Sequence, residues 1–443
     1  MIDDGGSGLS HPAGSRGKHA QAPHTATQQS GNVKLQMAAL AIAAGLMAAL
    51  AAGILHALVG SWQSLFLDRY TVTGPSMSMP ALILLPAAGG LLAGTLVNGL
   101  AEEAKGAGIS QIRGAVLHHG GRIRPRVAVV KLLATPLVLG SGGSAGIVGP
   151  MAQIGGALGS TVGQWRRLSE SQMRTLLAAG TAAGVAAIIN APAAGFLFAI
   201  EVVLGEASLG SAWVVALSAA VAGAVTRLIT GGATVLTPPT YTMDQPSALP
   251  LCLLLGILAS WVGVAFTCGL GWMEGVFGRA PFPRFLAPAV GGLVVGLIGI
   301  AFPQVLGLGY TTINSALSDQ LPAVMLAGLL LAKLTATCLT VGSGAPGGVI
   351  GPSLWMGTMF GGFLGGLAQA LLPASSIAPG ACALVGMGAV FAAAFHAPIT
   401  AVVIVLELTG EHSLALPLAI ACVSSSYLAG KISPRTVYNL GAS

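Results

Sequence analysis

Five long apolar segments set the strongest limit on how this chain can fold. Each is 18 to 25 residues long, and a helix crosses the hydrocarbon core of a bilayer with about 20 residues. A spanning helix also satisfies its own backbone hydrogen bonds, which lipid cannot do. The sequence therefore predicts several membrane-spanning helices. The segments are residues 35–59, 81–100, 249–270, 285–302 and 321–341.

The charge content agrees with a lipid environment. Only 7% of the residues are charged, whereas soluble domains have about 25%. Glycine accounts for 65 of the 443 residues, and small residues allow membrane helices to approach closely. We predict an all-α polytopic membrane protein, with the lipid bilayer as its surroundings. The net charge of +6 fits basic loops at anionic headgroups, and nothing in the sequence indicates a nucleic-acid partner.

The first 34 residues differ from the rest of the chain. They are polar, rich in Gly, Ser and His, and without apolar periodicity, which predicts a disordered tail over residues 1–34. The tail lacks the apolar core of a secretory signal. Arg16, Lys18 and Lys34 precede the first span, which favours a cytoplasmic N-terminus. The histidines of the tail are loosely spaced and the five cysteines stand singly, so we predict no metal site.

The chain contains an internal repeat. The segment "KLLATPLVLGSGGSAGIVGP" (131–150) aligns with "KLTATCLTVGSGAPGGVIGP" (333–352) at an offset of 202 residues, with 11 of 20 positions identical. At an offset of 206, "NAPAAGFLFAIE" (190–201) aligns with "HAPITAVVIVLE" (396–407). Low complexity explains matched glycines, but it does not explain matched lysines, Ala-Pro pairs and glutamates. We infer two homologous halves.

The repeat predicts a transport fold. The halves cover about 35–230 and 248–432, and duplicated membrane halves with helices broken at Gly and Pro are typical of transporters and channels. If the halves are inverted, the helices that follow Gly146 and Gly348 begin close together, with free amides and positive dipole ends directed at an anion. The alternative is that these glycines only permit close helix packing.

Several motifs resemble those of the CLC chloride channels and chloride/proton exchangers, over about residues 35–440. The internal glycine-rich turns and the two segments ending in glutamate match the family's patterns in order. The resemblance implies two inverted-topology repeats with broken and re-entrant helices, and a short terminal pore helix at about 433–440. The matching segments are "GAGIS" (106–110), "GIVGP" (146–150), "GSGAPGGVIGP" (342–352), "NAPAAGFLFAIE", "FHAPITAVVIVLELTGE" and "RTVYNL" (435–440).

The resemblance also implies where anions bind. A central anion would meet the backbone amides of Val349 and Ile350 and the hydroxyl of Tyr438, beside the position of Ala107. An external site and gate would be formed around residues 146–149, namely Gly146, Ile147, Val148 and Gly149.

Three departures from the family pattern bear on function. Val148 stands where the exchangers carry the glutamate that gates the external site and accepts protons, and Val202 stands where they carry the internal proton glutamate. Neither valine can ionise, so a proton relay through these positions is lost. Ala107 replaces a serine whose hydroxyl meets the central anion. One lost neutral hydrogen bond would weaken binding by about 0.5–1.5 kcal/mol.

Two pairs of buried charges leave alternatives open. Lys131 and Lys333 occupy equivalent positions, and they either attract anions by their positive potential or pair with a buried carboxylate or carbonyl. Glu201 and Glu407 are also equivalent. A structural role, such as accepting hydrogen bonds from free amides, is favoured over a role in transport.

We therefore predict a passive chloride channel of the CLC type that is uncoupled from protons and is not an enzyme. The resemblance implies a homodimer with one pore per subunit, in a bacterial inner membrane with both termini cytoplasmic. Bound chloride or another halide is the only expected ligand, with no cofactor. Because the sequence ends at Ser443, we expect no C-terminal regulatory domain and no nucleotide. The alternatives are a transporter that couples to protons by another route and a non-conducting scaffold.

Overall fold

The computed structural model describes residues 24–66, 79–205, 209–231, 236–241, 248–372 and 378–439. Apart from the single bridge described below, its regular structure is helical. The first half contains α1 (His24–Phe66), α3 (Met79–Leu100), the short 3-10 helix η1 (Glu102–Ala104), α4 (Ile109–His118), α5 (Arg126–Gly140), α6 (Val148–Trp165), α7 (Glu170–Ile189), α8 (Pro192–Phe198), the π-helical η2 (Ala199–Leu204) and α9 (Leu209–Thr230).

The second half repeats this order. It contains α10 (Ala248–Gly278), η3 (Arg284–Leu286), α11 (Ala287–Ala301), η4 (Pro303–Val305), α12 (Tyr310–Leu317), α13 (Ala323–Gly342), α14 (Ile350–Leu371), α15 (Pro379–Phe395), α16 (Pro398–Thr409), η5 (His412–Leu414) and α17 (Ala415–Ile432). Even the helix ends correspond. Both α7 and α15 end at a non-glycine residue in the left-handed conformation, Asn190 at φ 53° and His396 at φ 49°.

Eight helices within the described ranges are long and apolar enough to cross a membrane. Five of them cover the segments identified from the sequence, to within two residues at the ends of 285–302 and 321–341. The other three are 170–189, 211–230 and 412–432, whose Gly, Ser and Ala residues make them less apolar. The span over 170–189 has 89% of its most apolar window buried, against 33% for the span over 211–230. We therefore place α7 inside the protein and α9 at its surface.

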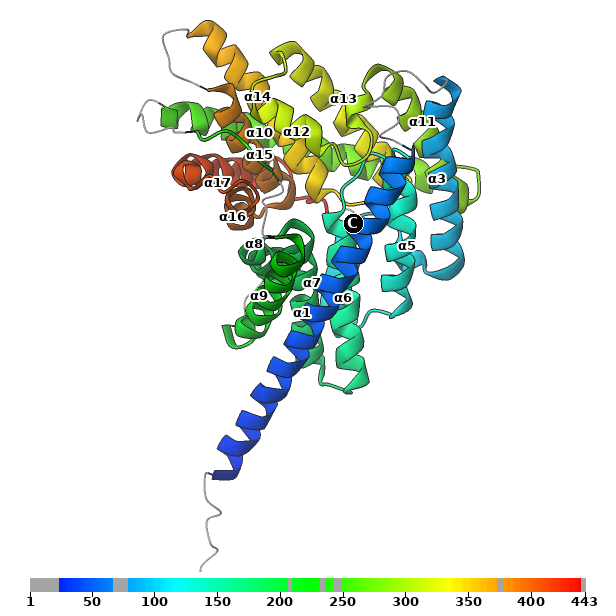
Figure 1. Cartoon of the computed structure of the whole chain (residues 1–443), viewed down its shortest axis with the longest axis vertical. Coiled ribbons are helices and arrows are strands. Elements are labelled where there is room, and N and C mark those ends of the chain that lie inside the picture. Colours follow the sequence, from blue (N-terminus) through cyan, green and yellow to red (C-terminus); the bar gives the residue numbers. More distant parts are fainter. Residues whose placement is uncertain are drawn as a thin grey trace, which may run out of the picture.

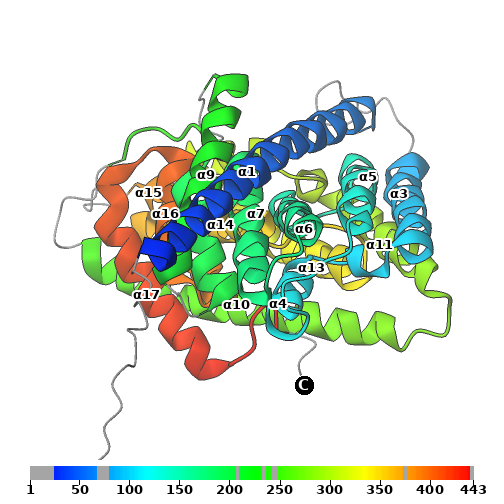
Figure 2. The ribbon, with the colours of Figure 1, turned by 90° about the horizontal axis from the view of Figure 1, so that it is seen from below.

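Equivalent helices pack in equivalent pairs. α6 packs on α7 as α14 packs on α15, and α1 packs on α9 as α10 packs on α17, while α3 packs on its own counterpart α11. Figure 1 places α13, α14 and α15 in the upper part of the molecule and α6, α7 and α9 in the lower part. Both ribbon views show α3 beside α11 at one edge of the molecule (Figures 1 and 2). The predicted fold class, two inverted repeats of broken helices, is confirmed.

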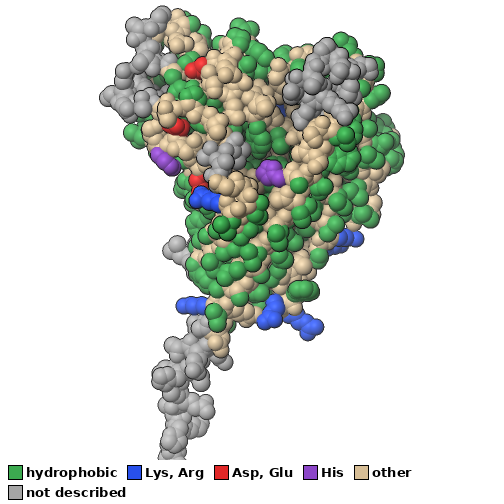
Figure 3. Space-filling model, viewed as in Figure 1, with side chains coloured by type: hydrophobic (Ala, Val, Ile, Leu, Met, Phe, Trp, Pro, Cys, Tyr) green, Lys and Arg blue, Asp and Glu red, His purple; other side chains and the backbone are tan. Residues whose placement is uncertain are grey.

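Close helix packing depends on small residues. A Cβ atom on Gly357 of α14 would overlap the carbonyl oxygen of Gly386 in α15, and Gly155 of α6 meets the carbonyl of Gly180 in α7 in the same way. Backbones approach at these points because no side chain separates them. The exposed surface is apolar across the middle of one face, while Lys and Arg side chains gather at its lower end (Figure 3). This distribution suits a bilayer.

Two predicted boundaries differ from the structure. Residues 1–23 of the predicted tail lie outside the described residues, but residues 24–34 belong to α1. A helix nucleated in the apolar segment extends one hydrogen bond at a time, and no proline interrupts it between residues 24 and 34. At the other end, residues 433–439 form an extended segment and a turn instead of the predicted pore helix. Ser433 is extended, at φ −145° and ψ 123°, as expected before Pro434.

Candidate anion-binding site

The two glycine-rich turns of the repeat meet at the centre of the fold. Gly146 and Gly348 form an antiparallel bridge, in which each backbone amide donates to the carbonyl of the other at 2.8 and 2.7 Å. Because two equivalent residues exchange identical hydrogen bonds, the local two-fold axis between the halves passes through this bridge. A Cβ atom on Gly348 would lie 2.8 Å from the Gly149 nitrogen, so only glycine permits the approach.

The bridge brings two helix N-termini side by side. α6 begins at Val148 after Ile147, and α14 begins at Ile350 after Val349. Among the described residues, no acceptor meets the amides of these four residues. Pro150 and Pro352 occupy the first turns, where a missing N–H costs nothing. Free amides and the positive ends of two helix dipoles therefore converge in one region.

The surroundings of these amides are apolar and closed to solvent. Ile147, Val349 and Ile350 are fully buried and Val148 is 2% exposed. Removal from water strengthens the attraction between amide dipoles and an anion, because less solvent screens it. The predicted external and central residues of the two helix starts are thus brought together. The side chain of Val148 places no titratable group at the start of α6.

The two buried lysines hold carbonyl oxygens. Lys131 donates to the carbonyls of Ala104 and Gly106 at 2.9 and 2.6 Å, and Lys333 donates to those of Val305 and Gly307 at 2.9 and 3.0 Å. Both side chains are fully buried. These contacts favour the carbonyl-pairing alternative. The lysines fix the segments that lead into α4 and α12.

The two equivalent glutamates cap helices of the opposite half. Glu201 accepts hydrogen bonds from the amides of Ile399 and Thr400 at 3.3 and 2.7 Å and from the Thr400 hydroxyl at 2.6 Å. Glu407 accepts from the amides of Ala193 and Ala194 at 3.1 and 2.7 Å. Each carboxylate thus satisfies the first free amides of α16 or α8. The contacts match the favoured structural role.

Ala107 lies beside the start of α6, whereas the Tyr438 hydroxyl is directed elsewhere. A Cβ atom on Gly149 would lie 2.8 Å from the Ala107 carbonyl oxygen, so Ala107 adjoins the start of α6. The Tyr438 hydroxyl donates to the carbonyl of Phe395 at 3.0 Å. A hydroxyl has a single proton, so in this arrangement Tyr438 does not donate to an anion, unlike in the predicted site.

Arg113 was missed from the sequence. Its guanidinium carbon lies 4.6 Å from the centre of the Tyr438 ring, which is within the range of a cation–π contact. The buried Arg113 Nε and the buried hydroxyl of Thr436 have no hydrogen-bond partner among the described residues. Their unused donors, and a positive charge, lie close to Tyr438. A basic residue six positions after Ala107, in an otherwise uncharged helix, was the signal in the sequence.

Comparison with known proteins now decides the family. The family model described as "Voltage gated chloride channel" matches residues 89–430. The chain belongs to this family, the CLC family. It is 37% identical over 370 residues to the H(+)/Cl(-) exchange transporter ClcA of Vibrio parahaemolyticus, covering 81% of this chain and 78% of the relative. It is 34% identical over 363 residues to the putative chloride channel protein ClcB-like of Ralstonia nicotianae, covering 81% and 84%.

Solved CLC structures share the fold. A slow cyanobacterial Cl-/H+ antiporter matches with a TM-score of 0.80 and 24% identity, over 92% of this chain and 96% of the other. A CLC-type fluoride/proton antiporter matches with a TM-score of 0.75 and 23% identity, over the same shares of the two chains. The suspected resemblance to the CLC family is therefore confirmed.

This CLC chain keeps the predicted proton-relay position apolar. Val202 lies in η2 and is fully buried. The carboxylate of its neighbour Glu201 accepts hydrogen bonds from two amides of α16. In the described part of the chain, no group of three His, Cys, Asp or Glu side chains could hold a metal ion.

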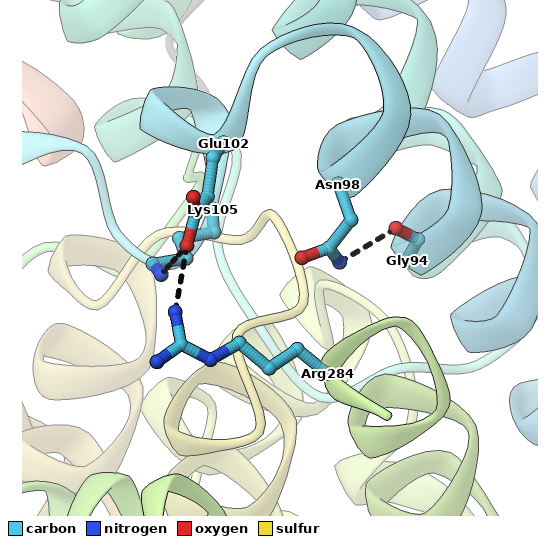
Figure 4. A network of polar contacts seen from close by, with 5 residues as sticks. All are labelled: Gly94, Asn98, Glu102, Lys105 and Arg284. Atoms are coloured by element: carbon cyan, nitrogen blue, oxygen red, sulfur yellow. Dashed lines mark hydrogen bonds and ion pairs between the residues drawn. The ribbon is translucent and has the colours of Figure 1, made fainter. Parts of the chain in front are cut away.

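A cavity of 360 Å³ opens beside Ala107 and was not found from the sequence. Its lining includes Gly106, Ala107 and Gly344, and its charged lining residues are Lys105, Glu274 and Arg284. Figure 4 shows Lys105 and the Arg284 guanidinium reaching one carboxylate oxygen of Glu102, at 2.7 and 3.1 Å. The sequence signal for this cavity was Glu274, an acidic residue at the end of an apolar span.

Proposed function

We propose that this CLC protein is a passive pathway for chloride, uncoupled from protons. The single observation that carries the proposal is Val148 at the first position of α6, beside amides that no protein acceptor meets. An anion would be held by backbone dipoles at this site, with no side-chain carboxylate to compete for it. Family membership and the ClcA relatives, named as H(+)/Cl(-) exchange transporters, support chloride as the transported ion.

The arrangement of charge favours anions. Lys131 and Lys333 are fully buried, and each donates to two carbonyl oxygens and not to a carboxylate. Glu201 and Glu407, in contrast, accept hydrogen bonds from the first amides of α16 and α8, whose positive dipole ends offset their charge. The region where the starts of α6 and α14 meet therefore has a positive potential from free amides and helix dipoles, which attracts monovalent anions and repels cations.

The central site would depend on backbone groups. We propose that the amides of Val349 and Ile350 hold the central anion, because the Ala107 methyl cannot donate and the Tyr438 hydroxyl is committed to Phe395. The external anion would use the amides of residues 147–149. Backbone amides recognise charge more than ion type, so we expect nitrate and bromide to pass as well as chloride.

Absence of proton coupling follows from side-chain chemistry. Motif resemblance aligns Val148 and Val202 with the two carboxylates that carry protons in the exchangers, and a valine cannot bind a proton at any pH. Both positions are buried, so water at the surface does not replace the lost carboxylates. An anion could then cross without an obligatory proton.

A second candidate, proton-coupled transport by another route, is favoured by one observation. Glu274 lines the cavity that reaches Ala107, so a titratable group does face the proposed pathway. The relatives named as exchange transporters and antiporters are consistent with this candidate.

Homodimerisation and location are part of the proposal. We propose two subunits, each with its own pathway, in a bacterial inner membrane with both termini on the cytoplasmic side. The apolar spans and the family support a multi-pass membrane protein. Cross-linking in native membranes and tagging of each terminus would test these points.

One experiment separates the functions. The purified protein is reconstituted in liposomes, and chloride efflux and proton movement are recorded together. Chloride flux without proton movement supports the passive pathway. Proton movement against its gradient, driven by a chloride gradient, refutes it in favour of coupled transport. Absence of flux for every anion tested would instead support a non-conducting role.

A further inference from the structure

Glu274 is a carboxylate without a direct hydrogen bond or ion pair among the described residues. It lies near the end of α10 and is exposed. A carboxylate in a membrane-spanning segment is rarely left without a function. Its position in the wall of a cavity gives it access to water and to any ion that enters.

The cavity leads from charged residues to the anion site. Lys105 and Arg284 line it together with Glu274, and so do Ala107 and Gly344. Ala107 adjoins the start of α6, where the free amides converge. Glu274 therefore lines the same cavity as the residue that adjoins those amides.

The charges around the cavity cancel when Glu274 is ionised. Lys105 and Arg284 are both bound to the Glu102 carboxylate (Figure 4), so these three groups together carry one positive charge. An ionised Glu274 brings the total to zero, and a protonated Glu274 leaves it at plus one. A positive cavity attracts anions and raises their local concentration, whereas a neutral one does not.

No other charged side chain lines the cavity, so no other group changes this net charge. α13 and the turn after it contribute Val341, Gly342, Ser343 and Gly344, and α3, α4 and the segment 433–439 contribute Asn98, Ser110, Gln111 and Val437. All of these are uncharged. α14, α15 and α17 also pack against α10, but they bring no residue to the cavity. Lys105 is the charged group with which Glu274 interacts electrostatically.

We propose that Glu274 is a proton-binding site that controls anion entry through this cavity. The inference rests on the proposed anion pathway. Proton binding neutralises the carboxylate, gives the cavity a net positive charge, and admits a monovalent anion to the site beside Ala107. Loss of the proton restores a negative charge that repels the anion. The proton regulates the pathway and need not be carried across the membrane.

The sign of the pH dependence follows directly. Flux is low where Glu274 is ionised and rises as the pH falls through its titration. One unit charge near the anion changes the local anion concentration by about fivefold at moderate ionic strength. Salt screens the effect, so the increase is larger in dilute salt than in concentrated salt.

The test measures chloride efflux and proton movement from liposomes, from about pH 4.5 to about pH 8. The wild-type protein should show the rise on acidification. Glu274→Gln should be as active at pH 8 as the wild type is at pH 4.5, with a flat profile. Glu274→Asp retains the carboxyl group and should retain the rise. The matched control is Glu170→Gln, since Glu170 is an exposed carboxylate that pairs with Arg174 outside the cavity.

Several outcomes would overturn the proposal. A pH profile in Glu274→Gln that equals the wild-type profile shows that another group titrates. A wild-type profile without acid activation, or a flat profile in Glu274→Asp, has the same consequence. Because Glu274→Asp keeps the charge, this result remains decisive even if Glu274→Gln does not fold.

A different result would refute the proposed passive function. Obligatory proton movement with chloride in the wild type refutes passive transport. If that movement is lost in Glu274→Gln, Glu274 still binds the proton and the inference about this residue stands. If it persists in Glu274→Gln, both proposals fall.

Discussion

Replacement of Val148 by glutamate would place a carboxylate at the convergence of the two helix N-termini. Its oxygens would reach amides at the start of α6, which no other acceptor meets among the described residues. The ionised side chain should occupy the external anion site and block chloride. Its protonated form has no charge to hold it there, so acidification should relieve the block.

The number of free amides and the burial of Val148 determine how strongly the carboxylate should block chloride flux. A hydrogen bond to a charged group contributes about 1.5–3 kcal/mol, so three amides at residues 147–149 provide about 4.5–9 kcal/mol. Val148 is only 2% exposed, and removal of a carboxylate from water costs several kcal/mol. We expect a net of about 1.4–2.8 kcal/mol in favour of the blocked state, which is a reduction in flux of about 10- to 100-fold.

Chloride efflux from liposomes measures the block as a function of pH. Val148→Gln is the matched control, because glutamine has the same shape without a titratable group. Val148→Gln should reduce flux by its bulk alone, equally at every pH, whereas Val148→Glu should recover as the pH falls. If Val148→Glu conducts like the wild type at every pH, an anion does not pass the start of α6, and the site has been misplaced.

Three further predictions concern stability and affinity. Glu201→Ala should lower the unfolding free energy by about 2–4 kcal/mol, because it leaves the Thr400 amide and hydroxyl unpaired; thermal unfolding in detergent measures this, and an unchanged midpoint would contradict the capping role. Gly348→Ala should prevent folding or transport, since its Cβ would lie 2.8 Å from the Gly149 nitrogen, a backbone atom that cannot move aside; normal flux from this variant would show that the turns do not cross as described. Ala107→Ser should tighten chloride binding about tenfold by adding one hydroxyl donor, measured by calorimetry, and unaltered affinity would exclude Ala107 from the central site.

The duplicated charges show how the fold is held together at its least regular points. Each lysine donates to carbonyls that precede a short helix, and each glutamate accepts from amides that begin a helix in the other half. In lipid, such free backbone groups would cost several kcal/mol each. These side-chain hydrogen bonds thus allow broken helices in the interior, and broken helices expose amides to an anion.

Much of the fold could be predicted from the sequence because its signals are local. The length of the apolar segments predicted five of the spans. The repeat of residues 131–150 at 333–352 predicted two equivalent halves. The Gly and Pro residues at the start of α6 and α14 predicted free amides there. The helix over 170–189 was harder to recognise, because a helix surrounded by protein does not require the apolar side chains that lipid demands.

The partners of side chains could not be predicted from the sequence. The Tyr438 hydroxyl meets the Phe395 carbonyl, 43 positions away in the chain, and its ring lies beneath Arg113. Pro434 was visible, but the turn it favours over the expected helix was recognised only in the structure. Contacts of this kind depend on how the halves cross, and that is a property of the folded chain.

The sequence by itself determined that the chain spans a membrane, that its two halves are equivalent, and that the residue at position 148 is a valine, which cannot ionise. These features follow from residue chemistry and spacing alone. The tertiary structure decided that the two glycine turns bridge through Gly146 and Gly348, that the buried lysines and glutamates serve backbone groups, and that Glu274 faces the cavity beside Ala107. Such facts depend on distances between residues far apart in sequence, and only packing sets those distances.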